Sequence, residues 1–177
     1  AGAILVFDGE RAWAPPHADV PFGARFQLRA WSYFLTVPFK LRDPGTHLKR
    51  EGLHTLRSRL VNAARLTFDA GIGDSSADWY LLYADPRTQQ LAALAYIVSY
   101  GRSRAEAEQA PHAVVFERHQ RVQGVLLPVA WTFHEWNEAA GPHGEPTGSV
   151  RVSSPRFVPY DASWFEKEAG MVEDPAR

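Results

Sequence analysis

The 177-residue sequence contains no cysteine, which excludes a disulfide framework, thiol catalysis and a zinc–thiolate site. It also has no apolar run that approaches the roughly 20 residues of a membrane-spanning helix. Net charge is almost absent, because 19 Lys and Arg stand against 20 Asp and Glu, for a formal charge of −1. This balance gives no electrostatic reason to expect a nucleic acid or an anionic membrane surface as the partner.

Signatures of catalysis are missing as well, since the chain has no HExxH, GxSxG, Walker or dinucleotide-binding pattern. The expected strand order brings His112 or His119 opposite His134, but their spacing does not build a metal shell. Asp78 and Asp85 are typical of a strand end and a turn rather than of an acid–base pair. We therefore expect no catalytic residue, no metal and no cofactor, and the sequence favours a non-enzymatic protein.

The segment Asp78–Tyr100 is the most informative part of the chain. It reads as two strands around the turn Asp85-Pro86-Arg87-Thr88, in which Pro86 presets φ and Asp85 bonds the backbone ahead of it. Large apolar residues point to both faces of these strands, whereas a sheet that is wet on one side alternates apolar with polar residues. Either both faces are covered, or one face lines a concave apolar space.

Turn signals and periodicity predict the remaining elements. Asp8-Gly9 predicts a two-residue hairpin turn, helical spacing predicts a helix over residues 22–37 that ends at Pro38, and Ser103–Glu106 forms a capping box. Residues 139–146 read as a loop and residues 161–168 as a terminal helical turn. The other expected strands cover residues 47–52, 55–69, 112–119, 122–137 and 147–157. These elements predict a single domain over residues 1–177 that is mainly β (α+β): a curved antiparallel sheet forming a half-barrel, with a helix covering the concave opening.

Several motifs carry a family resemblance through their order along the chain. They are the tyrosine-rich strand with its Asp-Pro-x-Thr turn, Phe7-Asp8-Gly9-Glu10, Trp31-Ser32-Tyr33-Phe34, the segment 38–45 and the turn and strand at 124–128. Together they resemble the lipoprotein-localisation (LolA/LolB-like) superfamily, nearest to a branch of small extracytoplasmic bacterial proteins of unknown function. The resemblance implies a curved sheet around an apolar cavity that binds an acyl chain or a similar ligand. It also implies an extracytoplasmic location, periplasmic or in the cell envelope, and an N-terminal segment with a signal and a further strand ahead of Ala1.

We expect the ligand, a hydrophobic small molecule or a lipid, to contact an aromatic wall formed by Trp31, Phe34, Trp79, Tyr83, Trp131 and Phe133. The sequence leaves open which sheet face is concave, the oligomeric state and whether a membrane-associated partner receives the ligand. Two alternatives stay open beside the binding protein. One is an enzyme that uses the same cavity on a small apolar substrate, with Glu135 or His134 essential. The other is a structural or interaction protein whose core is filled by its own side chains.

Overall fold

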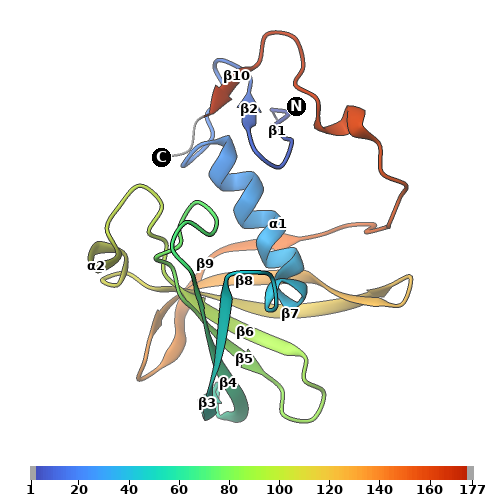
Figure 1. The fold of residues 1–177 in the computed structure, drawn as a ribbon. Helices are drawn as coiled ribbons and strands as arrows, with labels where there is room; N and C mark the ends of the chain where they lie inside the picture. The colour runs from blue at the N-terminus through green and yellow to red at the C-terminus, as the bar shows by residue number, and fades with distance from the viewer. Residues whose placement is uncertain (1–2, 175–177) are drawn as a thin grey trace. The chain divides into compact units, whose positions relative to one another are not determined.

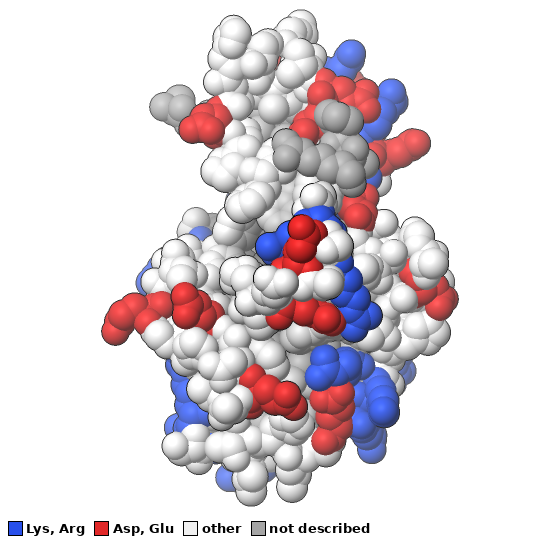
Figure 2. Space-filling model, turned by 90° about the vertical axis from the view of Figure 1, so that its left-hand side faces the viewer, with Lys and Arg blue, Asp and Glu red and all other residues white. Residues whose placement is uncertain are grey.

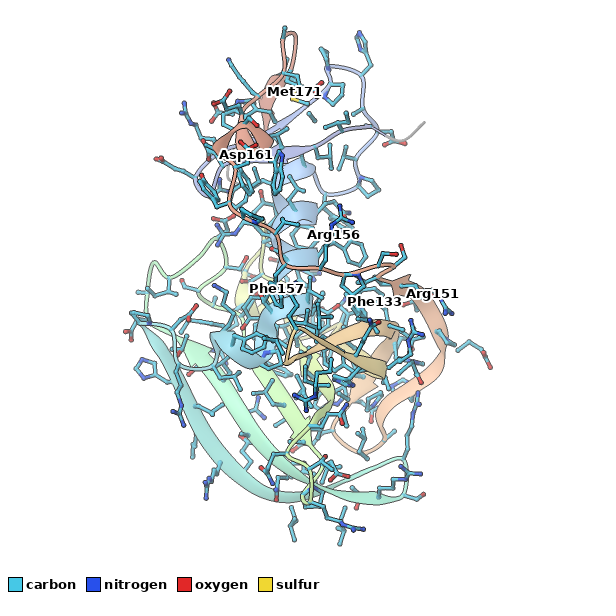
Figure 3. The ribbon with its side chains drawn as sticks, turned by 90° about the vertical axis from the view of Figure 1, so that its right-hand side faces the viewer. Phe133, Arg151, Arg156, Phe157, Asp161 and Met171 are labelled. Atoms are coloured by element: carbon cyan, nitrogen blue, oxygen red, sulfur yellow. The ribbon has the colours of Figure 1, made fainter. Side chains whose placement is uncertain are left out.

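The computed structural model describes residues 3–174, and this part of the chain forms two compact units. Unit 1 contains residues 3–36 and 157–174, and unit 2 contains residues 37–156. The chain passes from unit 1 to unit 2 within helix α1 (Ala24–Lys40) and returns between Arg156 and Phe157, both labelled in Figure 3. Each unit has its own sheet and is described separately.

Unit 2 is a seven-stranded antiparallel sheet in which the strands follow one another in sequence order (Figure 1). The strands are β3 (Thr46–Leu56), β4 (Arg59–Phe68), β5 (Tyr80–Ala84), β6 (Leu91–Tyr96), β7 (His112–Val122), β8 (Val125–Asn137) and β9 (Gly141–Arg151). The sheet is a meander, because each strand pairs with the strand that precedes it in the sequence. The predicted fold class is confirmed: the chain is mainly β, with one curved antiparallel sheet that does not close into a barrel.

The β5–β6 hairpin occupies the middle of this sheet, as the sequence predicts. Tyr83 lies opposite Ala93 in its ladder. At the turn, Asp85 Oδ1 accepts the backbone N–H groups of Arg87 and Thr88 at 2.9 and 2.8 Å. The Thr88 hydroxyl donates to the same oxygen at 3.1 Å, so one carboxylate organises three donors of an otherwise exposed loop.

Several strand boundaries in unit 2 differ from the prediction, including the end of β9 at Arg151, and two of the differences have a clear physical reason. The expected break between 52 and 55 is wrong, because Gly52, with φ 89°, forms a β-bulge within one continuous strand. The chain turns instead at Arg57-Ser58, where φ is 47° and 65°. The expected loop at 139–146 is also wrong, since β9 begins at Gly141. This strand pairs only with β8, so its prolines can face the open edge without removing a ladder hydrogen bond.

Unit 1 holds a three-stranded antiparallel sheet of β1 (Val6–Phe7), β2 (Ala12–Ala14) and β10 (Val172–Asp174), in the order β1-β2-β10. The predicted hairpin at Asp8-Gly9 is confirmed, but its two-residue turn is wrong. The connection has four residues, because Asp8 Oδ1 accepts the backbone N–H groups of Glu10 and Arg11 at 2.8 and 2.7 Å. An exposed 3₁₀ turn, η1 (Ala162–Phe165), confirms the terminal helical turn.

Helix α1 begins and ends later than predicted. Its start moves to Ala24 because Phe22 and Gly23 have φ of 62° and 89°, outside the helical region. Its end at Lys40 corrects the expected stop at Pro38, which lies inside the last turn. Proline there removes one backbone donor without preventing the final residues from remaining helical. The expectation that this helix covers the concave opening concerns the placement of the two units and stays a prediction.

The short helix α2 (Arg104–Ala107) confirms the predicted capping box. The Ser103 backbone N–H donates to Glu106 Oε2 at 2.8 Å, and the Glu106 backbone N–H donates to Ser103 Oγ at 3.3 Å. Ala107 is fully buried. The box therefore starts a helix of only four residues that delivers one apolar contact to the core of unit 2.

Candidate ligand-binding face

The strand register separates the predicted aromatic residues onto the two faces of the large sheet. Tyr83 lies opposite Ala93, Ala93 opposite Val115, and Val115 opposite Thr132. Residues directly opposite one another share a face, so Tyr83 and Thr132 do as well. Phe133, labelled in Figure 3, follows Thr132 in β8 and therefore points to the other face.

The six residues of the predicted wall fall into three groups. Trp79 contacts Trp136 in a T-shaped arrangement at 5.7 Å, which places it on the face of Tyr83. Trp131 shares the face of Phe133, two residues away. Trp31 and Phe34 lie on α1 within unit 1, where Trp31 is 41% exposed and Phe34 is buried. Within unit 2, the structure thus brings together Trp79 with Tyr83 and, on the opposite face, Trp131 with Phe133.

A hydrogen bond across the sheet identifies which face is concave. Trp136 Nε1 of β8 donates to the hydroxyl of Tyr83 of β5 at 3.1 Å. These strands are three steps apart in the sheet, which corresponds to about 14 Å in a flat sheet. Two side chains on one face can meet over that span only if the sheet bends toward them. The face of Tyr83 is therefore the concave one.

A second contact, made from the β3–β4 turn, supports this assignment. Arg57, in the β3–β4 turn, donates from Nη2 to His134 Nε2 of β8 at 3.4 Å. Strands β4 and β8 are four steps apart, or about 19 Å in a flat sheet. Strand β3 also contacts β9 at the opposite edge of the sheet. The two edges thus approach each other around the concave face without pairing.

The concave face carries one continuous apolar cluster. Its buried members are Leu56, Val61, Ala63, Trp79, Leu81, Tyr83, Ala93, Ala95, Ile97, Ala107, Ala113, Val115 and Trp136. Four of them are alanines of strands β4, β6 and β7, and each is at most 3% exposed. We call Ala63, Ala93, Ala95 and Ala113 the alanine floor. The rings of Trp79, Tyr83 and Trp136 belong to the same buried cluster and contact one another on this face. Burial raises the pKa of the Tyr83 hydroxyl, so this group stays protonated near neutral pH.

Polar side chains gather at the end of this face beside the β3–β4 turn. Thr132 Oγ1 donates to Glu117 Oε1 at 3.2 Å and lies 3.0 Å from His134 Nε2. His134 is only 3% exposed, and its Nδ1 lies 3.4 Å from the carbonyl oxygen of Gly144. Arg57 Nη1 lies 3.9 Å from Glu117 Oε1. We call Arg57, Glu117, Thr132 and His134 the rim cluster.

A second ion pair lies near Trp79. Arg65 Nε donates to Glu51 Oε1 at 2.6 Å, and the guanidinium carbon lies 4.8 Å from the centroid of the Trp79 ring. Such a contact holds a cation against the negative face of the indole. The contact orients the Trp79 ring. No local sequence pattern predicts it, because the pairing of Arg65 with Glu51 depends on the bulge at Gly52.

Sequence reasoning missed Arg57 and Thr132 as members of a site, and the six residues of the predicted wall did not include Trp136. The alternation of β8 contained part of the signal, because Thr132, His134 and Trp136 must share one face. Arg57 had no such signal. It reaches the face only because the turn falls at Arg57-Ser58 and the sheet bends.

The histidines considered for a metal site do not converge. His112 lies opposite Glu135 and Ala113 opposite His134, so His112 and His134 point to opposite faces of the sheet. Glu135 likewise faces away from His134, and its side chain is 72% exposed. Within residues 3–174, no group of three or more His, Cys, Asp or Glu side chains is arranged to hold a metal ion.

Asp78 is a buried carboxyl group at the start of the central hairpin, 8% exposed. Its Oδ1 accepts the Ser99 backbone N–H at 2.6 Å. Burial nevertheless raises the pKa of Asp78 to about 6, because the hydrogen bonds to Ser99 do not replace the lost hydration. This geometry ties the ends of β5 and β6 together rather than presenting an acid to a substrate.

Neither the surface charges nor the comparisons with known proteins indicate a specific class of partner. On the face shown in Figure 2, acidic and basic side chains lie beside one another rather than in a large patch of one sign. No helix in the described part of the chain is both long and apolar enough to cross a membrane. No protein-family model matches this chain, and comparisons with curated proteins and with solved structures found no significant match.

Proposed function

We propose that this protein is a non-enzymatic binding protein for a hydrophobic ligand, such as the acyl chain of a lipid or lipoprotein, and that it acts outside the cytoplasm. The concave face of unit 2 is the binding surface. The observation that supports the proposal is the alanine floor beneath aromatic rings. The extracytoplasmic location rests on the family resemblance.

The alanine floor and the rings of Trp79 and Trp136 differ in how readily they can rearrange. Ala93, Ala95 and Ala113 belong to the ladders of central strands, whose backbone is held by hydrogen bonds on both sides. Trp79 precedes β5, and Trp136 is the last residue but one of β8. Side chains at strand ends rearrange more readily than those in the middle of a sheet. An acyl chain would take the place of these rings above the alanines.

The energetics permit binding of moderate strength. Removing apolar surface from water contributes about 25 cal/mol per Å², so an acyl chain supplies several kcal/mol. Against this stand the ordering of the chain and the loss of the Tyr83–Trp136 hydrogen bond, about 1 kcal/mol. We expect dissociation constants in the micromolar range.

A neutral fluorescent probe, N-phenyl-1-naphthylamine, tests the proposal. Binding should raise the probe's emission and quench tryptophan emission, because Trp79 and Trp136 lie over the floor. The variant Ala95→Leu should weaken binding by filling space above the floor, whereas Trp164→Phe, on the exposed η1 turn, should not change it. Lipid extraction and native mass spectrometry of the purified protein supply an independent measurement. Saturating probe without any spectral change, together with an absence of lipid, would reject the proposal.

The second candidate is an interaction protein whose concave face is its own closed core. It is favoured by the close contacts of Trp79, Tyr83 and Trp136, each at most 9% exposed. In that case Ala95→Leu would reduce stability, since a packed core does not accept added volume. Binding proteins with displaceable rings tolerate the same substitution, so unfolding measurements on this variant separate the two candidates.

A further inference from the structure

The rim cluster contains a cation that is held in place without short ionic contacts. The side chain of Arg57 is 51% exposed, and its two contacts measure 3.9 Å to Glu117 and 3.4 Å to His134. Charge-assisted hydrogen bonds of a guanidinium are ordinarily about 2.7–2.9 Å long. Its N–H groups thus retain donor capacity toward another anion.

The backbone that carries Arg57 takes a conformation that its sequence disfavours. Arg57 and Ser58 have φ of 47° and 65°, the left-handed region that favours glycine or asparagine. The comparable turn between β7 and β8 uses Gln123-Gly124, with glycine at its second position. Strained conformations of this kind persist where the surroundings hold them, and they are frequent at functional sites.

The rim cluster and the alanine floor form one continuous surface. His134 lies directly opposite Ala113, and Thr132 lies directly opposite Val115. The Cβ atoms of such pairs are about 5 Å apart. A molecule with an apolar tail on the floor would therefore place a polar head among the rim residues, with Arg57 on the solvent side.

We propose that the rim cluster binds the anionic head, a carboxylate or a phosphate, of a single-tailed amphiphile. This inference rests on the proposed function, because the tail lies on the alanine floor. Arg57 is the charged partner of the head, and the Thr132 hydroxyl can turn from Glu117 to donate to it. Glu117 competes with the ligand for Arg57, so the site balances one internal carboxylate against an external anion.

Competition experiments with the full chain test the head-group preference. Decanoate, decyl phosphate and decan-1-ol each displace N-phenyl-1-naphthylamine, and the anions should compete better than the alcohol by about tenfold. Arg57→Gln should abolish this preference and leave decan-1-ol unaffected. Arg50→Gln is the matched control: it removes the same charge from an exposed position on the opposite face of β3. Comparing the two anions shows whether a carboxylate or a phosphate head is preferred.

Glu117→Gln should change the affinity for the anions in the opposite direction to Arg57→Gln. It removes the competing charge while keeping an acceptor for Thr132, so the anions should bind several-fold more tightly than to the unchanged protein. This variant tests anion binding by the rim cluster even if Arg57→Gln does not fold. Equal competition by anions and alcohol in the unchanged protein would overturn the inference, as would an unaltered preference in Glu117→Gln. Both results require that the probe binds. If the probe does not bind at all, the proposed function fails, and this inference fails with it.

Discussion

Trp136 Nε1 donates to the Tyr83 hydroxyl across 53 residues of sequence, joining β8 to β5 at 3.1 Å. The bond spans three steps of the sheet, so it can form only because the sheet bends and makes one face concave. It also joins two of the rings that cover the alanine floor. Loss of this bond should affect both stability and access to the floor.

Tyr83→Phe should lower the free energy of unfolding by about 1–3 kcal/mol, because it leaves the Trp136 N–H buried without a partner. Urea unfolding followed by tryptophan fluorescence measures the change. The control is Tyr160→Phe, at a side chain that is 79% exposed. A double-mutant cycle with Trp136→Phe should show coupling between the two sites, and purely additive effects would contradict the importance of this bond.

Asp78 should make the protein less stable as pH rises. Its folded pKa of about 6 exceeds its ordinary value of 3.8, so the folded state binds the proton more tightly than the unfolded chain. The resulting stabilisation is fully present below pH 3.8 and is lost as pH rises through about 6. Its size is on the order of 3 kcal/mol, since a tenfold change in protonation corresponds to about 1.4 kcal/mol.

Asp78→Asn should remove this pH dependence while keeping an oxygen that accepts the Ser99 N–H. The difference in unfolding free energy between the variant and the unchanged protein should shift in favour of the variant between about pH 4 and pH 8. Asp85→Asn is the control with the opposite sign. Backbone hydrogen bonds lower the pKa of Asp85, so its contribution is lost only as pH falls. Parallel pH profiles for Asp78→Asn and the unchanged protein would refute the assignment.

Ser58→Gly should stabilise the protein by about 0.5–1 kcal/mol, because glycine accepts positive φ without steric cost. The reverse change at the corresponding turn position, Gly124→Ser, should destabilise it by a similar amount. Thermal unfolding of both variants measures the pair. A loss of stability in Ser58→Gly would show that this backbone is not strained.

Phe34→Asp should destabilise the protein by several kcal/mol, since Phe34 is only 5% exposed and an unpaired charge would replace an apolar side chain. Phe39→Asp, at a residue of the same helix that is 54% exposed, is the matched control. Circular dichroism melting curves compare them. An unchanged melting temperature for Phe34→Asp would contradict the burial of this residue.

Local patterns of the sequence determined the elements whose hydrogen bonds close within a few residues. Asp85 organises the β5–β6 turn through Arg87 and Thr88, and Ser103 caps α2 through Glu106. The antiparallel sheet follows from such hairpins, because each one dictates the pairing of its own two strands. The same reasoning failed at Gly52 and at residues 139–146. There a glycine serves a bulge rather than a turn, and prolines are tolerated because the strand lies at the sheet edge.

Only the tertiary structure decided which aromatic residues meet. Alternation assigns Tyr83 and Phe133 each to one face of its own strand. Whether the two residues share a face of the sheet depends on the register of three successive strand pairs. Asp174 likewise caps α1 by accepting the Arg25 backbone N–H, across 149 residues. Arg57 reaches His134 only after a strained turn and the bend of the sheet have both formed. Contacts of this kind depend on the accumulated geometry of many strands, whereas short sequence windows encode only the conformation of the segment itself.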